Sequence, residues 1–172
     1  MGTPELSIIV PTLQERDNVR ELISRLDRVL PGINWEVVFV DDDSADGTAP
    51  LVREIGRADP RVRCIQRIGR RGLSSACIEG MLSSSAPYLA VMDGDLQHDE
   101  SLLPEMLRIV KAGDMDLVIG SRYVEAGGTG QWNAGRAQVS RVATKLARGV
   151  LAAGPSDPMS GFFLLRSEVF HA

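Results

Sequence analysis

The chain has 172 residues, of which 44% are hydrophobic and 24% charged, a composition that excludes a disordered or low-complexity protein and suffices for one packed domain. Its 19 lysines and arginines against 23 aspartates and glutamates give a formal net charge of -4, which disfavours general nucleic-acid binding. No apolar run approaches the roughly 20 residues that a membrane-spanning helix requires.

Apolar segments alternate with amphipathic ones along most of the chain. Short β-branched runs predict strands, and apolar residues at helical spacing predict helices. In chain order, the expected elements are strand 6–10, helix 19–30, strand 36–40, helix 48–55, strand 62–66, helix 73–82, strand 88–92, helix 102–110 and strand 117–119. Asn18 and Glu21 form an N-x-x-E pattern, which predicts a capping box at the start of the first helix.

The rhythm changes after residue 120. A glycine-rich segment, 124–135, predicts a loop, and 136–151 predicts a helix. A turn at 154–158 and a late strand at 161–165 complete the pattern.

Strands that alternate with helices predict βαβ units and a mostly parallel sheet covered on both faces. Such sheets bind ligands beyond the carboxyl ends of their strands. The candidate site therefore lies in the segments that follow the strands, at 11–15, 41–43, 93–97 and 120–123.

The D-x-D motif Asp93-Gly94-Asp95 follows the fourth predicted strand. If the chain stays extended there, Asp93, Asp95 and Gln97 point to one side and present three oxygen ligands. Mg²⁺ and Mn²⁺ prefer oxygen ligands and often keep waters or substrate phosphates as the remainder, while Gly94 leaves room for a ligand. D-x-D alone also fits two solvated carboxylates, but its place after a buried strand favours a metal site.

Three adjacent carboxylates, Asp41, Asp42 and Asp43, follow the second predicted strand and repel one another unless a partner compensates them. One interpretation is a solvated acidic turn in which Ser44 or Asp46 caps the next helix. The other is that Asp41 and Asp42 contact a ligand. Both interpretations are kept, because a cap and a ligand contact can coexist in one loop.

Other enzyme classes lack their motifs here. The segment after the first strand, 11–15, contains no glycine, which disfavours the G-x-G-x-x-G dinucleotide fingerprint, and no Walker A loop is present. A phosphatase with an aspartyl nucleophile also uses D-x-D, but after its first strand.

The basic residues allow two interpretations each, whereas the cysteines allow a simpler prediction. The predicted helix 136–151 is basic on one side and apolar on the other, so it either lies on anionic lipid or is an ordinary surface helix. Arg70 and Arg71 face either phosphate or solvent. Cys64 and Cys77 have no metal-ligand spacing, which predicts two reduced thiols.

Five motifs in this order resemble family 2 glycosyltransferases of the dolichol-phosphate mannose synthase type, over about residues 6–166. The motifs are Val10-Pro11-Thr12 with Glu15, Val40 to Thr48, Asp93 to His98, Gly120 to Tyr123, and Asp157 to Phe163. The family often has Tyr-Asn where this chain has Leu13-Gln14, so a stacking surface for the base is lost.

The resemblance implies a GT-A fold, an α/β architecture with a Rossmann-like, mostly parallel central sheet flanked by helices. It implies a metal-dependent, inverting hexosyltransferase that moves mannose from GDP-mannose onto polyprenyl (dolichyl) phosphate, with Mg²⁺ or Mn²⁺ as cofactor. The alternatives are a donor that is UDP-glucose or another UDP-sugar, and a nucleotide-binding domain without transfer activity. We expect one catalytic domain over residues 1–172 that is truncated at its C-terminus. We also expect a cytoplasmic protein whose full-length form meets the cytoplasmic face of the membrane.

The resemblance also implies roles for single residues. The nucleotide base and ribose would contact Pro11, Leu13, Glu15, Val40 and Asp42. The remaining roles concern the sugar, the phosphates and the metal: Asp93 and Gly94 for the nucleotide or sugar, Asp95 and Gln97 for the metal, Arg122 for the donor phosphates, and Ser140 and Arg141 for the acceptor phosphate.

Asp93, Asp95, Arg122 and Asp157 are the catalytic candidates. A phosphate acceptor is already ionised near neutral pH and needs no strong general base. Asp157 is kept as the one candidate base, and its alternative is a turn residue before Pro158.

Overall fold

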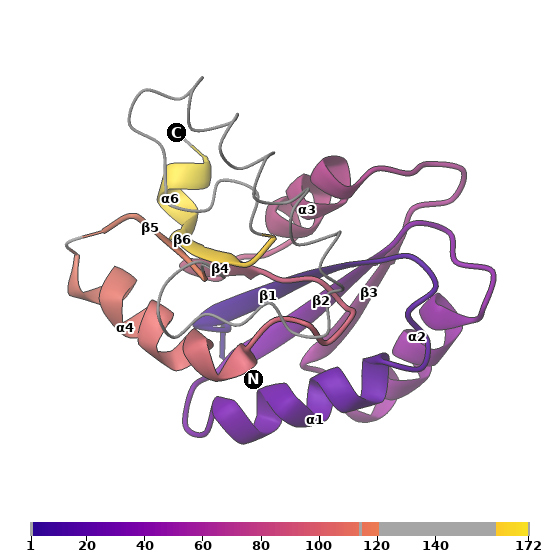
Figure 1. Ribbon diagram of the computed structural model, residues 1–172, viewed down its shortest axis with the longest axis horizontal. Coiled ribbons are helices and arrows are strands. Elements are labelled where there is room, and N and C mark those ends of the chain that lie inside the picture. Colours follow the sequence, from indigo (N-terminus) through magenta and orange to yellow (C-terminus); the bar gives the residue numbers. More distant parts are fainter. Residues whose placement is uncertain (1, 114, 121–160, 172) are drawn as a thin grey trace, which may run out of the picture.

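A central sheet organises the computed structural model of the chain, which describes residues 2–113, 115–120 and 161–171. Its six strands have the order β3-β2-β1-β4-β6-β5 (Figure 1). The strands are β1 (Leu6–Thr12), β2 (Trp35–Asp41), β3 (Val62–Gln66), β4 (Tyr88–Val91), β5 (Leu117–Ile119) and β6 (Phe163–Arg166). β1 to β4 are mutually parallel, whereas β6 runs antiparallel to both β4 and β5. The predicted mostly parallel α/β sheet is therefore confirmed.

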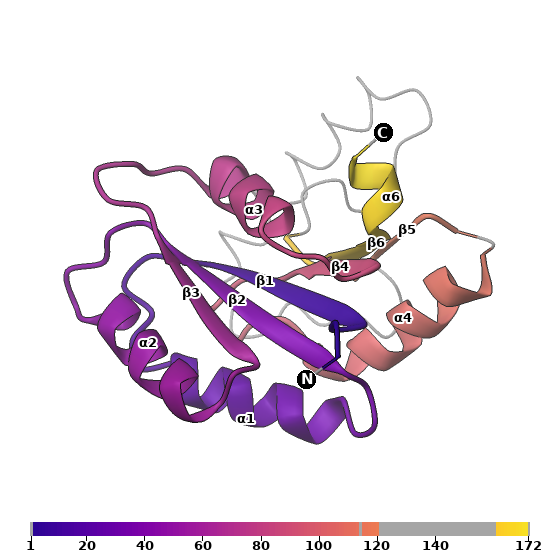
Figure 2. The same ribbon diagram turned by 180° about the vertical axis from the view of Figure 1, so that it is seen from behind.

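Helices cover both faces of this sheet (Figures 1 and 2). They are α1 (Val19–Val29), α2 (Thr48–Ala58), α3 (Leu73–Leu82), α4 (Leu103–Ala112) and α6 (Ser167–Phe170), with a short 3₁₀ helix, Glu100–Leu102, before α4. α1, α2 and α4 pack on one face, and α3 and α6 pack on the other. Within the described ranges, no helix has the length and apolarity needed to cross a membrane.

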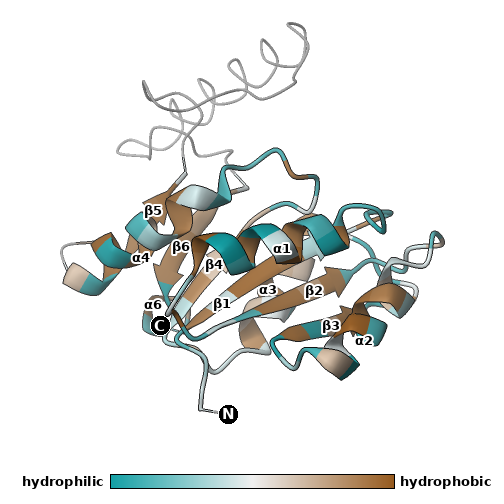
Figure 3. Ribbon diagram, turned by 90° about the horizontal axis from the view of Figure 1, so that it is seen from below, coloured by the Kyte–Doolittle hydropathy of each residue, from teal (hydrophilic) through white to brown (hydrophobic). Residues whose placement is uncertain are grey.

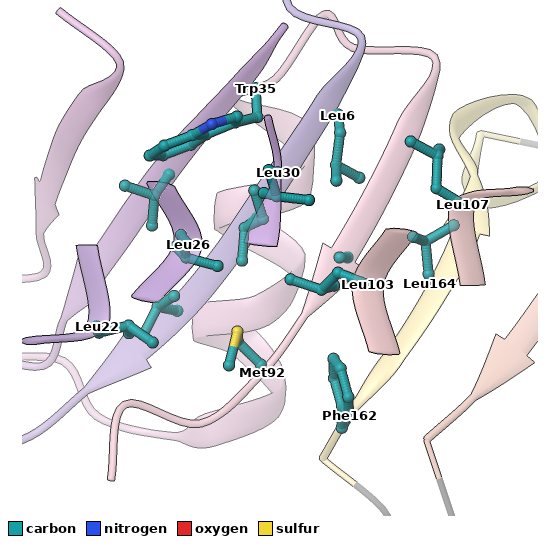
Figure 4. Close-up of a cluster of buried hydrophobic side chains, with 14 of the residues drawn as sticks. Leu6, Leu22, Leu26, Leu30, Trp35, Met92, Leu103, Leu107, Phe162 and Leu164 are labelled. Atoms are coloured by element: carbon teal, nitrogen blue, oxygen red, sulfur yellow. The ribbon is translucent and has the colours of Figure 1, made fainter. Parts of the chain in front are cut away.

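Strand alternation divides the core into two layers. In β1, Leu6, Ile8 and Val10 face α1, α2 and α4, whereas Ile9 faces α3. Figure 4 shows the larger layer, and Figure 3 shows the strands as hydrophobic segments between helices that carry hydrophilic residues. Each large apolar side chain buried in this way contributes about 1.5–3 kcal/mol relative to leaving it exposed.

The helix starts differ in part from the prediction. The capping box is wrong: Asn18 makes no side-chain cap, and its Nδ2 donates instead to Glu15 Oε2 at 2.5 Å. The N-cap of α2 is Gly47 and makes no side-chain cap, but Asp46 just before it accepts the N–H of Thr48, the first residue of the helix, at 3.0 Å. The predicted loop 124–135, helix 136–151 and turn 154–158 lie outside the described residues.

Candidate functional site

The strand order reverses direction beside β1. From β1 the chain proceeds outward to β2 and β3, and then returns to β4 on the other side of β1. Ligands of open α/β sheets bind at such a switch point, outside the carboxyl ends of the strands. The segments that follow β1, β2 and β4 all emerge at this edge because the three strands are parallel. The structure thus brings together the expected segments 11–15, 41–43 and 93–97.

Unusual backbone conformations also gather at this edge. Among the described residues, three that are not glycine have positive φ: Gln14 (61°), Asp43 (59°) and Leu96 (61°). One lies in each loop, after β1, β2 and β4 respectively. The left-handed backbone conformation costs roughly 1–2 kcal/mol of conformational free energy for a residue other than glycine. Residues in this conformation cluster at functional sites. Local bonds hold it in place, for example from the Gln14 N–H to Ser44 Oγ at 2.8 Å.

Asp41 is a buried residue whose carboxylate stabilises the loops at this edge. Its side chain is fully buried (0% exposed), and its Oδ2 accepts the N–H of Ser44 at 2.9 Å. Its Oδ1 accepts the hydroxyls of Ser44 at 2.6 Å and of Thr12 at 3.3 Å. These bonds join the loops after β1 and β2, so the interpretation of Asp41 as a ligand contact is wrong.

Asp42 is held by a residue that the sequence patterns missed. Its Oδ1 lies 2.6 Å from Nη1 of Arg67, and its Oδ2 accepts the N–H of Gly72 at 2.7 Å. Arg67 is itself buried and follows β3 directly. The segment after the third strand lies at the same edge of the sheet. Its position after a parallel strand could therefore have identified Arg67 as a candidate site residue.

Asp93 is held by residues that arrive from two directions. His98 Nε2 lies 3.0 Å from Asp93 Oδ2, and the His98 ring packs on Phe162 with 5.2 Å between ring centroids. A Cβ atom on Gly161 would lie only 2.9 Å from Asp93 Oδ2, so glycine leaves room for the carboxylate. His98 and Gly161 belonged to recognised motifs without a role, and the structure gives them one.

The chain turns after Gly94. Leu96 has a left-handed backbone, and Asp95 Oδ1 accepts the N–H of Gln97 at 3.1 Å. The expected alignment of Asp93, Asp95 and Gln97 along an extended chain is therefore wrong. Gly94 is needed for packing, because a Cβ there would meet Thr12 Cγ2 at 3.2 Å.

Negative charge accumulates at the switch point. Partial burial raises the pKa of Glu15, and the charges of Asp95, Asp46 and Asp93 raise it further against the hydrogen bond from Asn18. Mutually repelling carboxylates with oxygen donors fit a hard divalent cation. In the part of the chain that the structure describes, no three His, Cys, Asp or Glu residues converge on one metal position. Asp95 and Gln97 remain the residues expected to hold such a cation; Mg²⁺ commonly takes one or two protein ligands together with substrate phosphates.

The remaining expected contacts have different surroundings. Leu13 is exposed and Pro11 half-buried at the end of β1. Val40 is fully buried, and its side chain packs in the core layer on the α3 side of the sheet; its expected contact with a nucleotide stays a prediction. Strand alternation turns it inward.

Four expected contacts, Arg122, Ser140, Arg141 and Asp157, lie outside the described residues and stay predictions. Arg70 pairs with Glu79 at 2.9 Å, and Arg71 is exposed.

Both cysteines are free thiols, as predicted. Burial is the main cause that raises the pKa of Cys77 to about 11, and the charge of Asp93 adds to it. Burial likewise raises the pKa of Cys64.

A family model and curated relatives of this chain point to the same protein family. The family model described as Glycosyl transferase family 2 matches residues 7–172. A dolichol-phosphate mannosyltransferase from Pyrococcus furiosus is 42% identical over 167 residues, which cover 96% of this chain and 47% of that protein. One from Mycosarcoma maydis is 36% identical over 177 residues, covering 99% and 59%. The chain thus spans about half the length of the curated relatives it matches.

Solved structures support the fold. Glucosyl-3-phosphoglycerate synthase from Mycobacterium tuberculosis, in complex with Mn²⁺, UDP-glucose and phosphoglyceric acid, aligns with a TM-score of 0.71 at 18% identity, over 96% of this chain and 57% of that one. A mannosyltransferase from Pyrobaculum calidifontis, in complex with GDP-mannose and Mn²⁺, aligns with a TM-score of 0.59 at 22% identity, over 70% and 36%. The expected GT-A fold is confirmed.

Proposed function

The chain belongs to glycosyl transferase family 2, and from this we propose that it is the donor-binding part of a metal-dependent, inverting glycosyltransferase. The donor is GDP-mannose and the acceptor is a polyprenyl phosphate. The names of the two curated relatives support this choice over a UDP-sugar. The observation that carries the proposal is the position of Asp93 and Asp95 at the switch point, beside the fixed carboxylate of Asp42.

The described residues divide the work of holding the donor. Asp42 presents a fixed, charged hydrogen-bond acceptor to the nucleoside, while Asp95 and Gln97 hold the cation at the diphosphate. A bound Mg²⁺ or Mn²⁺ supplies neutralisation of the charge that develops on the leaving nucleoside diphosphate. Asp93, oriented by His98, contacts the sugar or nucleotide.

The transfer step forms one bond and breaks one. An oxygen of the acceptor phosphate attacks the anomeric carbon while the bond to the diphosphate breaks on the opposite face, so the anomeric configuration inverts. A phosphate monoester is ionised near neutral pH, and no strong general base is needed. This chemistry agrees with a site whose carboxylates are engaged in holding and orienting.

The proposal extends to four residues outside the described part of the chain and to a membrane surface. Arg122 contacts the donor phosphates, Ser140 and Arg141 the acceptor phosphate, and Asp157 is the candidate base. An apolar polyprenyl tail partitions into lipid, which supports a membrane surface as partner. The cytoplasmic face of that membrane is part of the same proposal.

Titration calorimetry with GDP and with UDP, each in the presence of Mn²⁺, tests the donor. We expect GDP to bind more tightly. Tighter binding of UDP would replace the mannose proposal by a UDP-sugar, and binding of neither would contradict a donor site.

Transfer is tested separately with GDP-mannose and a polyprenyl phosphate. We expect mannosyl phosphopolyprenol and GDP as products. A chain that binds GDP and Mn²⁺ but transfers nothing is a nucleotide-binding domain without this activity.

A further inference from the structure

We propose that Arg67 is a positioning residue that fixes the carboxylate of Asp42 for the nucleoside of the donor. The inference rests on the proposed function, because that function assigns Asp42 to the nucleoside. Arg67 touches neither the metal position nor the reacting atoms in this assignment, and it acts through Asp42.

Arg67 and Gly72 together remove the rotational freedom of Asp42. Arg67 Nη1 donates to Asp42 Oδ1 at 2.6 Å, and the N–H of Gly72 donates to Oδ2 at 2.7 Å. Each carboxylate oxygen therefore has one donor, and rotation of the carboxylate would break both bonds. Each oxygen keeps lone pairs for a further donor from the ligand.

The guanidinium is itself fixed by the loop between β3 and α3. Nη1 also donates to the carbonyl of Gly72 at 3.0 Å, and Nη2 donates to Ser75 Oγ at 2.5 Å. Nε lies 3.2 Å from Glu79 Oε2 as an ion pair, although its geometry is not that of a hydrogen bond. The backbone N–H of Arg67 donates to the carbonyl of Asp41 at 2.8 Å.

Both side chains of the Arg67–Asp42 pair are nearly buried, so Asp42 depends on Arg67 for charge compensation. The Arg67 side chain is 3% exposed, and that of Asp42 is 10% exposed. Without Arg67, Asp42 would be a nearly buried carboxylate with no cation to compensate it, so it would turn toward water or bind a proton. Because the fold already orders Asp42, the ligand does not have to do so, and this preorganisation raises the affinity for the nucleoside.

A second arginine–carboxylate pair, whose arginine lies in β3, provides a control; its arginine is 39% exposed and its carboxylate is nearly buried. Arg63, four residues earlier in β3, lies 2.9 Å from Glu36, whose side chain is also 10% exposed. Both residues lie toward the amino ends of their strands, away from the switch-point edge. Loss of Arg63 therefore also removes the charged partner of a nearly buried carboxylate, which keeps the hydroxyls of Ser7 and Ser84, but it leaves Asp42 unchanged.

The experiment compares Arg67→Met with Arg63→Met by calorimetry. The ligands, each with Mn²⁺, are inorganic pyrophosphate and whichever of GDP or UDP the unaltered chain binds more tightly. We expect Arg67→Met to raise the Kd of the nucleotide roughly 10- to 100-fold and to leave that of pyrophosphate unchanged. Arg63→Met should also lower the Tm, by less than Arg67→Met because Arg63 is more exposed, and should leave both Kd values within about twofold.

Specific outcomes overturn the inference. They are unchanged nucleotide binding by Arg67→Met, an equal loss of nucleotide and pyrophosphate, and an equal loss of nucleotide in Arg63→Met. If the unaltered chain binds pyrophosphate but no nucleotide, the proposed function fails and the inference fails with it. A failure of the inference alone is recognised by normal nucleotide binding in the unaltered chain.

If Arg67→Met does not fold, substitution of a hydrogen-bond partner of Arg67 tests the same inference. Ser75→Ala removes one acceptor of Arg67 at an exposed position, and we expect about a two- to fivefold rise in the nucleotide Kd. In an Asp42→Asn background, Ser75→Ala should have no further effect, because Arg67 acts through Asp42. Additive losses would contradict this pathway.

Discussion

Neighbouring aspartates of this protein have different tasks. Asp41 is fully buried and joins two loops, whereas Asp42 is fixed by Arg67 with lone pairs to spare. Asp93 is oriented by His98, whereas Asp95 accepts the backbone N–H of Gln97. The surroundings of each carboxylate, more than its identity, decide whether it serves the fold or a ligand.

Replacement of Asp95 tests the metal position. We expect Asp95→Ala to weaken Mn²⁺-dependent GDP binding by at least roughly 100-fold, since a charged ligand of the cation is lost. Asp17→Ala is the control, because it removes the same charge from a side chain that is 98% exposed, and its Kd should not change. Unchanged binding by Asp95→Ala in calorimetry would overturn the assignment.

The charge of Glu15 predicts a pH-dependent stability. Its pKa is raised in the folded state, first by burial, so folding favours the protonated carboxyl. Ionised Glu15 therefore destabilises the metal-free fold at neutral pH, and this penalty disappears below about pH 4, where the unfolded chain also binds the proton. Glu15→Gln should raise the Tm at neutral pH and have little effect in acid.

Glu21 gives the opposite sign as a control. The hydrogen bond from Arg25 lowers its pKa, so the stability that ionised Glu21 contributes is present at neutral pH and lost as the pH falls. Glu21→Gln should lower the Tm slightly at neutral pH. Thermal melts of both variants across pH check the pair, and a gain for Glu15→Gln that is equal at every pH would point to packing instead.

At the scale of elements, α3 connects the core to the site. Its small residues Ala76 and Gly80 face the sheet, and its Ser75 and Glu79 contact Arg67. The helix can approach β1 and β2 closely only because Gly80 has no side chain. The position of Asp42 thus depends on the packing of a helix that carries no expected site residue.

Gly80→Ala tests this close approach. The new Cβ would lie 2.3 Å from Ile9 Cγ2 and 2.9 Å from Val40 Cγ2. Overpacking costs about 1–3 kcal/mol, which outweighs or matches the roughly 1 kcal/mol that alanine gains in helix propensity. Urea unfolding should show a net loss of stability, while Ser74→Ala at an exposed position of α3 should stay within about 0.5 kcal/mol. A more stable Gly80→Ala variant would contradict the observed helix–sheet distance.

At the scale of the molecule, β6 joins the late sequence to the centre of the sheet. It lies antiparallel between β4 and β5 (Figure 1). Gly161, two residues before β6, lies close to the carboxylate of Asp93. Leu164 of β6 packs in the same core layer as α1 and α4 (Figure 4). The late segment therefore contributes to both the core and the site.

Leu164→Ala measures this contribution to stability. Leu164 is fully buried, and its truncation should cost about 2–5 kcal/mol in the free energy of unfolding. Leu82→Ala makes the same chemical change at a side chain that is 61% exposed and should cost less than about 0.5 kcal/mol. Equal losses in urea unfolding would show that β6 is not part of the cooperative core.

The succession of strands and helices along the chain, the mostly parallel sheet and the edge where ligand contacts are expected all follow from local sequence patterns. Hydrophobic periodicity is a local property, and the strands 62–66 and 117–119 and the helix 73–82 were predicted to the residue. The free state of both cysteines also followed from spacing alone.

Which of the edge residues meet depends on the three-dimensional packing of the chain. The pairing of Asp42 with Arg67, and of Asp93 with His98 beside Gly161, depends on the strand order and on the return of β6, which no local pattern encodes. The turn after Gly94 and the burial of Asp41 arise because neighbouring loops donate hydrogen bonds to these carboxylates. A periodic pattern shows which face a residue occupies, whereas its partner is chosen by a segment that is distant in the sequence.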